Sequence, residues 1–196
     1  MLEPSNIAHA QVLHLHWQTD LTVLSLRGEG SAICSAVEQA MGVPYPLAAN
    51  TTQVSDAARL IWVSPDDCFI IAPPAQATKI EADLRQALQS LHFAVTDVSS
   101  GYHTLSLAGS GVRSLLAQGC PLDLHPSKFS LGQCAGSHFF KASLWLWPVA
   151  SDSANGDSKF ELLIRRSFAP YVNTMIHKAS LELQVERSGA EIEAYA

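Results

Sequence analysis

A short segment that occurs twice in the chain constrains the fold more than any other feature. Residues 24–30 read Leu-Ser-Leu-Arg-Gly-Glu-Gly and residues 105–111 read Leu-Ser-Leu-Ala-Gly-Ser-Gly, so the two copies differ at two of the seven positions. Each copy stands before an apolar stretch of helical character that ends near a Gly-x-Pro sequence, at 42–44 and at 119–121. A segment repeated in the same context indicates a chain built from two related α+β halves.

The first half reads as one α+β unit. Runs of apolar and β-branched residues predict strands at 21–27, 60–63, 68–72 and 93–98, and amphipathic spacing predicts helices at 31–41 and 76–90. The Ser-Pro-Asp-Asp sequence between the second and third of these strands has the composition of a tight turn. This order of strands and helices, βαββαβ, is that of a ferredoxin-like unit.

The second half repeats this order. Strands are predicted near 135–141, 143–149 and 159–165, and a last amphipathic helix is predicted from about residue 167. We expect residues 21–98 and 99–186 to form two halves that pack as one folding unit. Residues 1–20 are expected to be an N-terminal arm that is irregular or lies at a sheet edge, and the polar residues 187–196 a frayed tail.

The composition limits the kinds of partner. Charged residues make up 15% of the chain, against about 25% in an ordinary soluble domain. Because charge mostly covers surface, this deficit favours a chain that a partner protein partly covers. The net charge of −6 argues against nucleic acid as that partner. There is no apolar run of about 20 residues and no signal-peptide pattern, so we expect a cytoplasmic protein without a membrane partner.

The residues that most resemble chemical sites fail on spacing. The two Gly-x-Gly segments lack the third glycine of a dinucleotide fingerprint and predict tight turns. Cys120, Asp123 and His125 are near neighbours in the chain, whereas triads are assembled from separate elements, so we predict a rigid connector there. His14 and His16 would share one face of an extended segment near His9, but no further ligand is fixed by spacing. We therefore predict no catalytic residue, no metal site and free cysteine thiols.

Two pairs of residues are candidates for a protein interface. Trp145 and Trp147 alternate on one predicted strand and point the same way, either into the core or towards a partner, since tryptophan is favoured at interface centres. Arg165 and Arg166 end a strand just before a helix. They are either a solvated pair or a clamp for a partner's carboxylate. The sequence leaves both alternatives open.

Several segments, in the same order along the chain, resemble the γ subunit of heterotetrameric sarcosine oxidase. They are residues 25–28, 62–74, 98–109, 115–126 with Phe129, and 160–168. The most specific is Gly-Cys-Pro-Leu-Asp-Leu-His-Pro at 119–126, whose Leu122 and His125 join the candidate interface residues. The resemblance implies a complex that oxidatively demethylates sarcosine to glycine and hydrogen peroxide and passes a one-carbon unit to tetrahydrofolate. It also implies that larger α and β subunits hold FAD, FMN and NAD. The γ subunit would have no cofactor and would contact mainly the α subunit, which it supports structurally.

The γ subunit fold resembles the folate-binding part of the glycine-cleavage aminomethyltransferase, which raises a rival hypothesis. This chain would then bind folate by itself. Glu161 lies where that family has its Gly-Tyr/Phe-Glu segment, and its carboxylate would pair with the donor edge of a pterin. The Thr-Gly-Glu sequence that the transferases carry just upstream is absent, because residues 153–159 read Ser-Ala-Asn-Gly-Asp-Ser-Lys.

Overall fold

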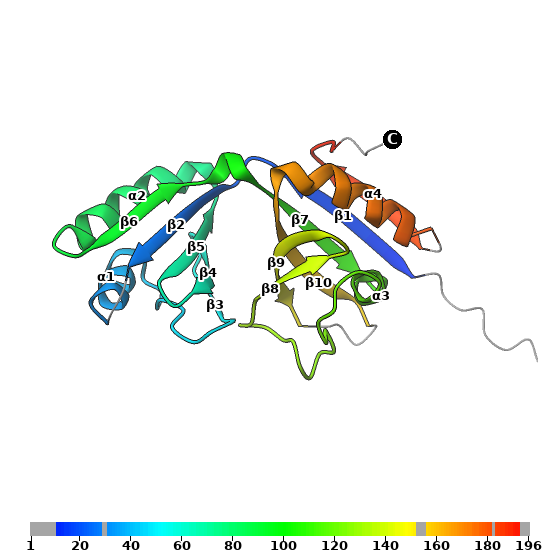
Figure 1. Cartoon of the computed structure of the whole chain (residues 1–196), viewed down its shortest axis with the longest axis horizontal. Coiled ribbons are helices and arrows are strands. Elements are labelled where there is room, and N and C mark those ends of the chain that lie inside the picture. The colour runs from blue at the N-terminus through cyan, green and yellow to red at the C-terminus, as the bar shows by residue number, and fades with distance from the viewer. Residues whose placement is uncertain (1–10, 29–30, 152–155, 182, 193–196) are drawn as a thin grey trace, which may run out of the picture.

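The computed structural model contains two sheets that pack against each other, and the helices lie on their outer faces (Figure 1). The structure describes residues 11–28, 31–151, 156–181 and 183–192. The elements are, in chain order, β1 (Val12–Gln18), β2 (Thr22–Gly28), α1 (Ser31–Met41), β3 (Thr52–Val54), β4 (Arg59–Ser64), β5 (Asp67–Ala72), α2 (Pro74–Leu88), β6 (Phe93–Asp97), η1 (Ser99–Gly101), β7 (Tyr102–Gly109), α3 (Val112–Ala117), β8 (Ala135–Phe139), β9 (Ala142–Ala150), β10 (Ser158–Arg165), η2 (Arg166–Phe168), α4 (Ala169–Ala179) and β11 (Gln184–Gly189). Among the described residues, the strand pairs are antiparallel except for β1 with β11. The predicted α+β class is confirmed.

The sheet of the first half has the order β3-β4-β5-β2-β6. Apart from the short edge strand β3, this is the strand order of the predicted ferredoxin-like unit, with β2 paired antiparallel to both β5 and β6. Alternate residues of β2 and β5 point towards α1 and α2, where Leu24, Leu26 and Ile70 lie buried in one core. Periodicity was sufficient to place these strands, because each buries one face under a helix.

The sheet of the second half has the order β11-β1-β7-β10-β9-β8. It includes strands from both ends of the chain, where an N-terminal arm and a frayed tail were expected. In the first sheet, the place beside β2 is filled by β6 from the same half. The equivalent place beside β7 is filled by β1, which pairs antiparallel to β7 and parallel to β11. Residues 12–18 are therefore an internal strand and neither irregular nor an edge. Residues 187–189 belong to β11 and are not frayed.

Hydrophobic burial holds β1 in this internal place. Leu13, Leu15 and Trp17 are at most 5% exposed and pack in the core under α3 and α4. His14 and His16 alternate with them on the opposite face, which is the period-two pattern of a half-buried strand. The alternation was thus visible in the sequence, although residues 1–20 were expected to be an arm.

Gly109, in the second copy of the repeated segment, allows β1 to approach. Its φ of +119° is a conformation that side-chain-bearing residues rarely adopt, and a Cβ there would lie 2.4 Å from the carbonyl oxygen of Val12. Two residues later, the backbone N–H of Gly111 donates a 2.9 Å hydrogen bond to the same oxygen. The Gly-x-Gly segment, where a tight turn was predicted, therefore also packs against the first residue of β1 and hydrogen-bonds to it.

Candidate functional site

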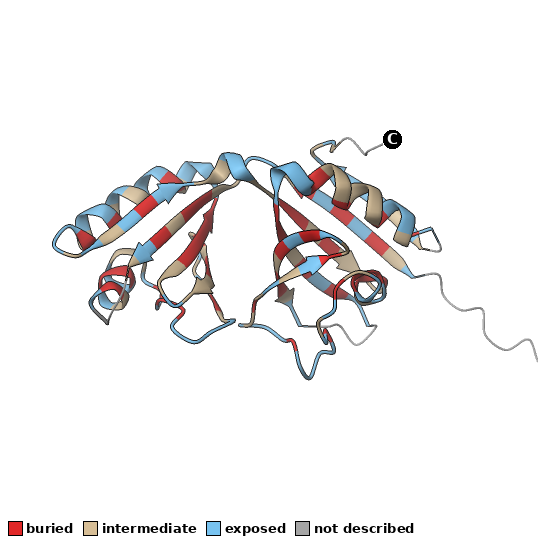
Figure 2. Ribbon diagram, viewed as in Figure 1, coloured by how far each residue is buried: buried red, intermediate tan, exposed pale blue. Residues whose placement is uncertain are grey.

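The sheet faces that turn away from the helices meet in an apolar layer, here called the inter-sheet seam (Figure 2). The first sheet supplies Val23, Ile61, Phe69 and Ile71, and the second supplies Cys134, Trp147 and Leu163. All seven are less than 8% exposed. Polar groups inside this apolar layer are unusual and are considered first.

Aromatic rings cross the seam. The ring of Phe69 on β5 makes edge-to-face contacts with Trp145 on β9 and Tyr102 on β7, at centroid distances of 5.2 Å and 5.4 Å. Such edge-to-face pairs contribute about 1 kcal/mol each beyond the area they bury. These contacts help to fix the orientation of one sheet on the other.

A polar cluster, here called the Glu161 cluster, lies in the seam and joins three strands. Glu161 on β10 stands opposite Trp147 on β9 in the sheet register, and the Trp147 indole Nε1 donates a 2.9 Å hydrogen bond to Glu161 Oε2. Arg59 reaches this oxygen from β4 of the first sheet, with its Nε 3.8 Å away, and its guanidinium lies 5.7 Å from the Trp147 ring centroid. The Glu161 carboxylate therefore links the two halves.

Burial sets the electrostatics of the Glu161 cluster. The Arg59 side chain is 18% exposed and that of Glu161 is 26% exposed. Burial lowers the pKa of Arg59 below its ordinary value, and the negative charge of Glu161 opposes this shift. A partly buried guanidinium needs a nearby anion, and here this chain supplies the anion itself.

Cys134 lies in the seam between two loops. Its backbone N–H donates to the Asn50 carbonyl at 2.8 Å, and its thiol donates to the Thr51 carbonyl at 3.1 Å. Burial raises the pKa of Cys134 to about 11, so the thiol is protonated near neutral pH and is a poor nucleophile. The predicted free thiol is confirmed, and its contacts are structural.

The two tryptophans point the same way, as their alternation predicts, and both face the seam. Trp147 is 0% exposed and contacts the other sheet of this chain, so its ring offers no surface to a partner. Trp145 is half-buried at the margin of the seam. The core interpretation therefore holds for Trp147.

The Cys120 to His125 block forms a connector and brings no triad together. The Cys120 thiol is buried and lies 3.7 Å from Ser137 Oγ. Asp123 and His125 are exposed, and their contacts are local: Asp123 Oδ1 accepts from the His125 backbone N–H at 3.0 Å, and His125 Nδ1 lies 2.8 Å from Ser127 Oγ. Leu122 is half-buried against the second-half core.

His14 and His16 share one face of β1, as expected for an extended segment, and each meets a residue of β11. His14 Nδ1 lies 2.8 Å from Glu186 Oε2, and His16 Nδ1 lies 2.9 Å from Ser188 Oγ. His9 lies outside the described residues. Among residues 11–28, 31–151, 156–181 and 183–192, no group of three potential metal ligands is close enough to hold an ion.

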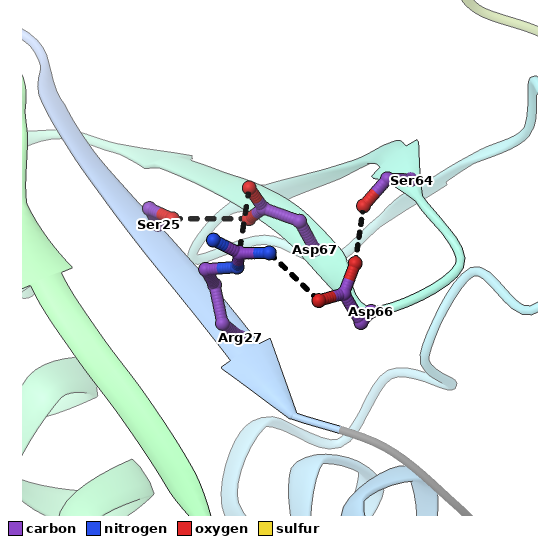
Figure 3. Close-up of polar contacts among 5 residues, drawn as sticks. All are labelled: Ser25, Arg27, Ser64, Asp66 and Asp67. Carbon is purple, nitrogen blue, oxygen red and sulfur yellow. Dashed lines mark hydrogen bonds and ion pairs between the residues drawn. The ribbon is translucent and has the colours of Figure 1, made fainter.

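A second polar cluster, which sequence reasoning missed, fixes the turn between β4 and β5 onto β2 (Figure 3). Arg27 Nη2 pairs with Asp66 Oδ2 at 2.7 Å, Ser25 Oγ donates to Asp67 Oδ1 at 3.0 Å, and Ser64 Oγ donates to Asp66 Oδ1 at 2.7 Å. The Ser64 and Arg27 hydrogen bonds lower the pKa of Asp66, whereas burial raises that of Asp67. The sequence showed a turn, but not that its carboxylates bind a strand outside the hairpin.

Arg165 and Arg166 are exposed where β10 continues into η2. The Arg165 guanidinium lies 5.6 Å from the ring centroid of Tyr102. Next to them, burial lowers the pKa of His103, and the positive charge of Arg166 lowers it further. The His103 ring is therefore neutral near pH 7, and the positive charge of this region comes from the arginines.

Comparisons with known proteins give one family and two informative solved structures. The model of the sarcosine oxidase, gamma subunit family matches residues 27–182. A chain of heterotetrameric sarcosine oxidase from Corynebacterium sp. U-96, solved in complex with pyrrole 2-carboxylate, is 25% identical, with a TM-score of 0.76 over 92% of this chain and 87% of that one. No curated protein matches the chain.

The second structure is aminomethyltransferase T of the glycine cleavage system from Bartonella henselae. It is 14% identical, with a TM-score of 0.62 over 91% of this chain. This chain spans about half of that protein, 48% of its length, and the likeness is one of fold alone. It agrees with the predicted resemblance to the folate-binding part of an aminomethyltransferase. No helix in the described part of the chain is long and apolar enough to cross a membrane.

Proposed function

Because the chain belongs to the sarcosine oxidase gamma subunit family, we propose that it is the small, non-catalytic subunit of a heterotetrameric sarcosine oxidase. It packs mainly on the α subunit and also meets the β subunit. These larger subunits hold FAD, FMN and NAD, and they convert sarcosine to glycine, hydrogen peroxide and methylene-tetrahydrofolate in the cytoplasm. The observation that carries the proposal is the family match, which spans nearly all of both halves.

The contacts of the chemically reactive side chains support a structural role. Glu161 accepts from Trp147 and faces Arg59, the Cys134 thiol donates to a backbone carbonyl, and Asp67 accepts from Ser25. Each of these groups is engaged in holding two elements of the chain together. A catalytic group must instead present its reactive atom to a substrate.

The surface supports the expectation of a covering partner. Leu47, Val54 and Leu131 are 72%, 57% and 50% exposed, and they belong to two neighbouring segments of the two halves. These segments are joined by hydrogen bonds such as that from the Thr52 backbone N–H to the Gly132 carbonyl, 2.9 Å long. Exposed apolar side chains in a chain with 15% charged residues favour burial against another subunit.

The candidate interface residues differ in how much surface they offer. His125, Arg165 and Arg166 are exposed, and Leu122 and Trp145 are half-buried. These five side chains remain proposed contacts, because each has surface for a partner to cover. Trp147 is omitted, since its surface is fully covered within the chain.

The test is to produce the complex with and without this chain. We expect that the larger subunits alone elute as smaller or aggregated species and lose sarcosine-dependent hydrogen peroxide production faster on warming. Size-exclusion chromatography and a peroxide assay measure the two effects. Equal assembly, stability and turnover in the absence of the chain would refute the structural role.

The rival function, folate binding by this chain alone, depends on Glu161. Trp147 and Arg59 both approach the Oε2 atom of Glu161, so a pterin that pairs with both carboxylate oxygens would have to compete with these two contacts. Calorimetry of the chain with tetrahydrofolate separates the hypotheses. Saturable binding that Glu161→Gln abolishes would favour the rival, and no binding supports the structural role.

A further inference from the structure

We propose that Arg165 and Arg166, together with Phe168, form a docking surface for an acidic segment of a partner subunit. This surface, here called the arginine pair, deepens the proposed function and rests on it. Arg165 is the last residue of β10, Arg166 is the first of η2, and Phe168 is 37% exposed. In Figure 1 the end of β10 and the turn that follows it lie at the top of the molecule, and η2 contacts η1 there.

The charges of the chain single out the arginine pair. The chain carries a net charge of −6, and other arginines face carboxylates of the chain itself: Arg27 meets Asp66, and Arg85 meets Glu81. In the described part of the chain, no carboxylate lies within ion-pairing distance of Arg165 or Arg166. Two adjacent exposed cations on an otherwise acidic chain are complementary to carboxylates from outside.

The geometry of the pair suits carboxylates. The Arg165 guanidinium carbon lies 5.6 Å from the centroid of the Tyr102 ring, a cation–π contact that favours this position of the side chain. A guanidinium presented in this way can bind a carboxylate through two parallel hydrogen bonds, and restraint in advance lowers the entropy lost on binding. Phe168 adds an apolar contact next to the charges.

The start of α4 adds to the positive potential. Phe168 is the N-cap residue, there is no side-chain cap, and the first turn of α4 contains no acidic residue. The dipole of a helix N-terminus favours negative charge, and this end of α4 lies directly after the arginine pair, although the Ala169 N–H already donates to the Arg166 carbonyl and Pro170 has no N–H. The neutral His103 ring neither adds to this charge nor offsets it. Nucleic acid is disfavoured as the occupant because the chain as a whole would repel a polyphosphate.

The test measures association of the intact chain with the larger subunits. The variant is Arg165→Glu with Arg166→Glu. Its matched control is Lys79→Glu with Lys159→Glu, which changes the net charge equally at exposed positions on α2 and at the opposite end of β10 from the pair. We expect the arginine variant to bind about a hundredfold more weakly than wild type, about tenfold for each arginine, and the control to stay within about threefold. Raising the salt from about 0.05 M to about 0.5 M should weaken wild-type binding more than that of the arginine variant.

A conservative variant keeps the proposal testable if charge reversal disturbs folding. Arg165→Lys with Arg166→Lys keeps both charges and loses the bidentate geometry, so we expect binding about fivefold weaker than wild type. If the arginine variants bind as tightly as the control while the wild type assembles normally, the docking role of the arginine pair is refuted and the proposed function stands. A wild-type chain that retrieves no flavin-containing subunit from its native cells would overturn the proposed function and this inference together.

Discussion

Replacing Glu161 by alanine removes the acceptor at the centre of the Glu161 cluster. Trp147 is 0% exposed, so its indole N–H, which now donates to Glu161 at 2.9 Å, would have no access to water. Arg59, with 18% of its side chain exposed, would lose the carboxylate 3.8 Å away. The two losses fall on opposite sides of the seam, on β9 of one sheet and β4 of the other, so we expect a large effect on the stability of the chain.

The magnitude follows from these two losses. A buried donor left without a partner costs about 1–3 kcal/mol, and an ion pair that is partly open to solvent contributes about 1 kcal/mol. We expect Glu161→Ala to lower the free energy of unfolding by about 2–4 kcal/mol. Glu161→Gln keeps an oxygen for the Trp147 N–H and loses only the charge, so its cost should be about 1 kcal/mol.

Urea unfolding followed by circular dichroism measures these differences. The matched control is Glu186→Ala, because Glu186 is also a strand carboxylate with a side-chain partner, His14 Nδ1 at 2.8 Å, but is 74% exposed, and we expect a cost below about 0.5 kcal/mol. If Glu161→Ala costs no more than Glu186→Ala, the cluster does not hold the halves together. If Glu161→Gln costs as much as Glu161→Ala, the charge and not the buried N–H dominates, and the magnitudes above are wrong.

Two further predictions concern β1 and the region beside the arginine pair. Gly109→Ala should lower the free energy of unfolding by about 3 kcal/mol, because of the strain of a positive φ and the clash with Val12. The control Gly42→Ala, at φ +65° in open space, should lower it by about 1 kcal/mol. Equal costs in thermal unfolding would refute the close approach of β1. Because the folded chain holds the pKa of His103 below the ordinary 6.5, it binds fewer protons there than the unfolded chain, so this residue's contribution to stability falls as the pH drops below about 6.5. Arg166→Gln should raise the pKa of His103 in an NMR titration, and an unchanged pKa would contradict their proximity.

The order of elements was predictable wherever a strand or helix carries its own periodic signal. In the first half, the predicted strands at 60–63 and 68–72 correspond to β4 and β5, because turn residues separate two apolar runs. No strand was predicted at the short β3, since its residues Thr52–Val54 have no such run. It pairs with β4, and its preceding residue bridges to Gln133 of the other half.

The candidate site was predictable only in part. Glu161 was singled out as a pterin-binding carboxylate, but neither Arg59 nor the hydrogen bond from Trp147 was expected. The reason is physical: Arg59 lies on the other sheet, and the contact exists only because the seam brings the two sheets together. The Arg27 and Asp66 pair was missed for a related reason, since it joins β2 to the turn between β4 and β5, which lies about 40 residues further along the chain.

The sequence by itself determined that the chain has two related α+β halves, because the repeated segment and the periodic spacing of apolar residues are local patterns that do not depend on tertiary contacts. It also determined the family, since the order of the matched segments is written in the chain. Only the tertiary structure decided where β1 lies. The alternation of Leu13, Leu15 and Trp17 with polar residues marks a half-buried strand, but nothing in that pattern identifies the neighbouring strand. Pairing is settled by backbone hydrogen bonds and by the close approach at Gly109, and both depend on residues nearly a hundred positions away.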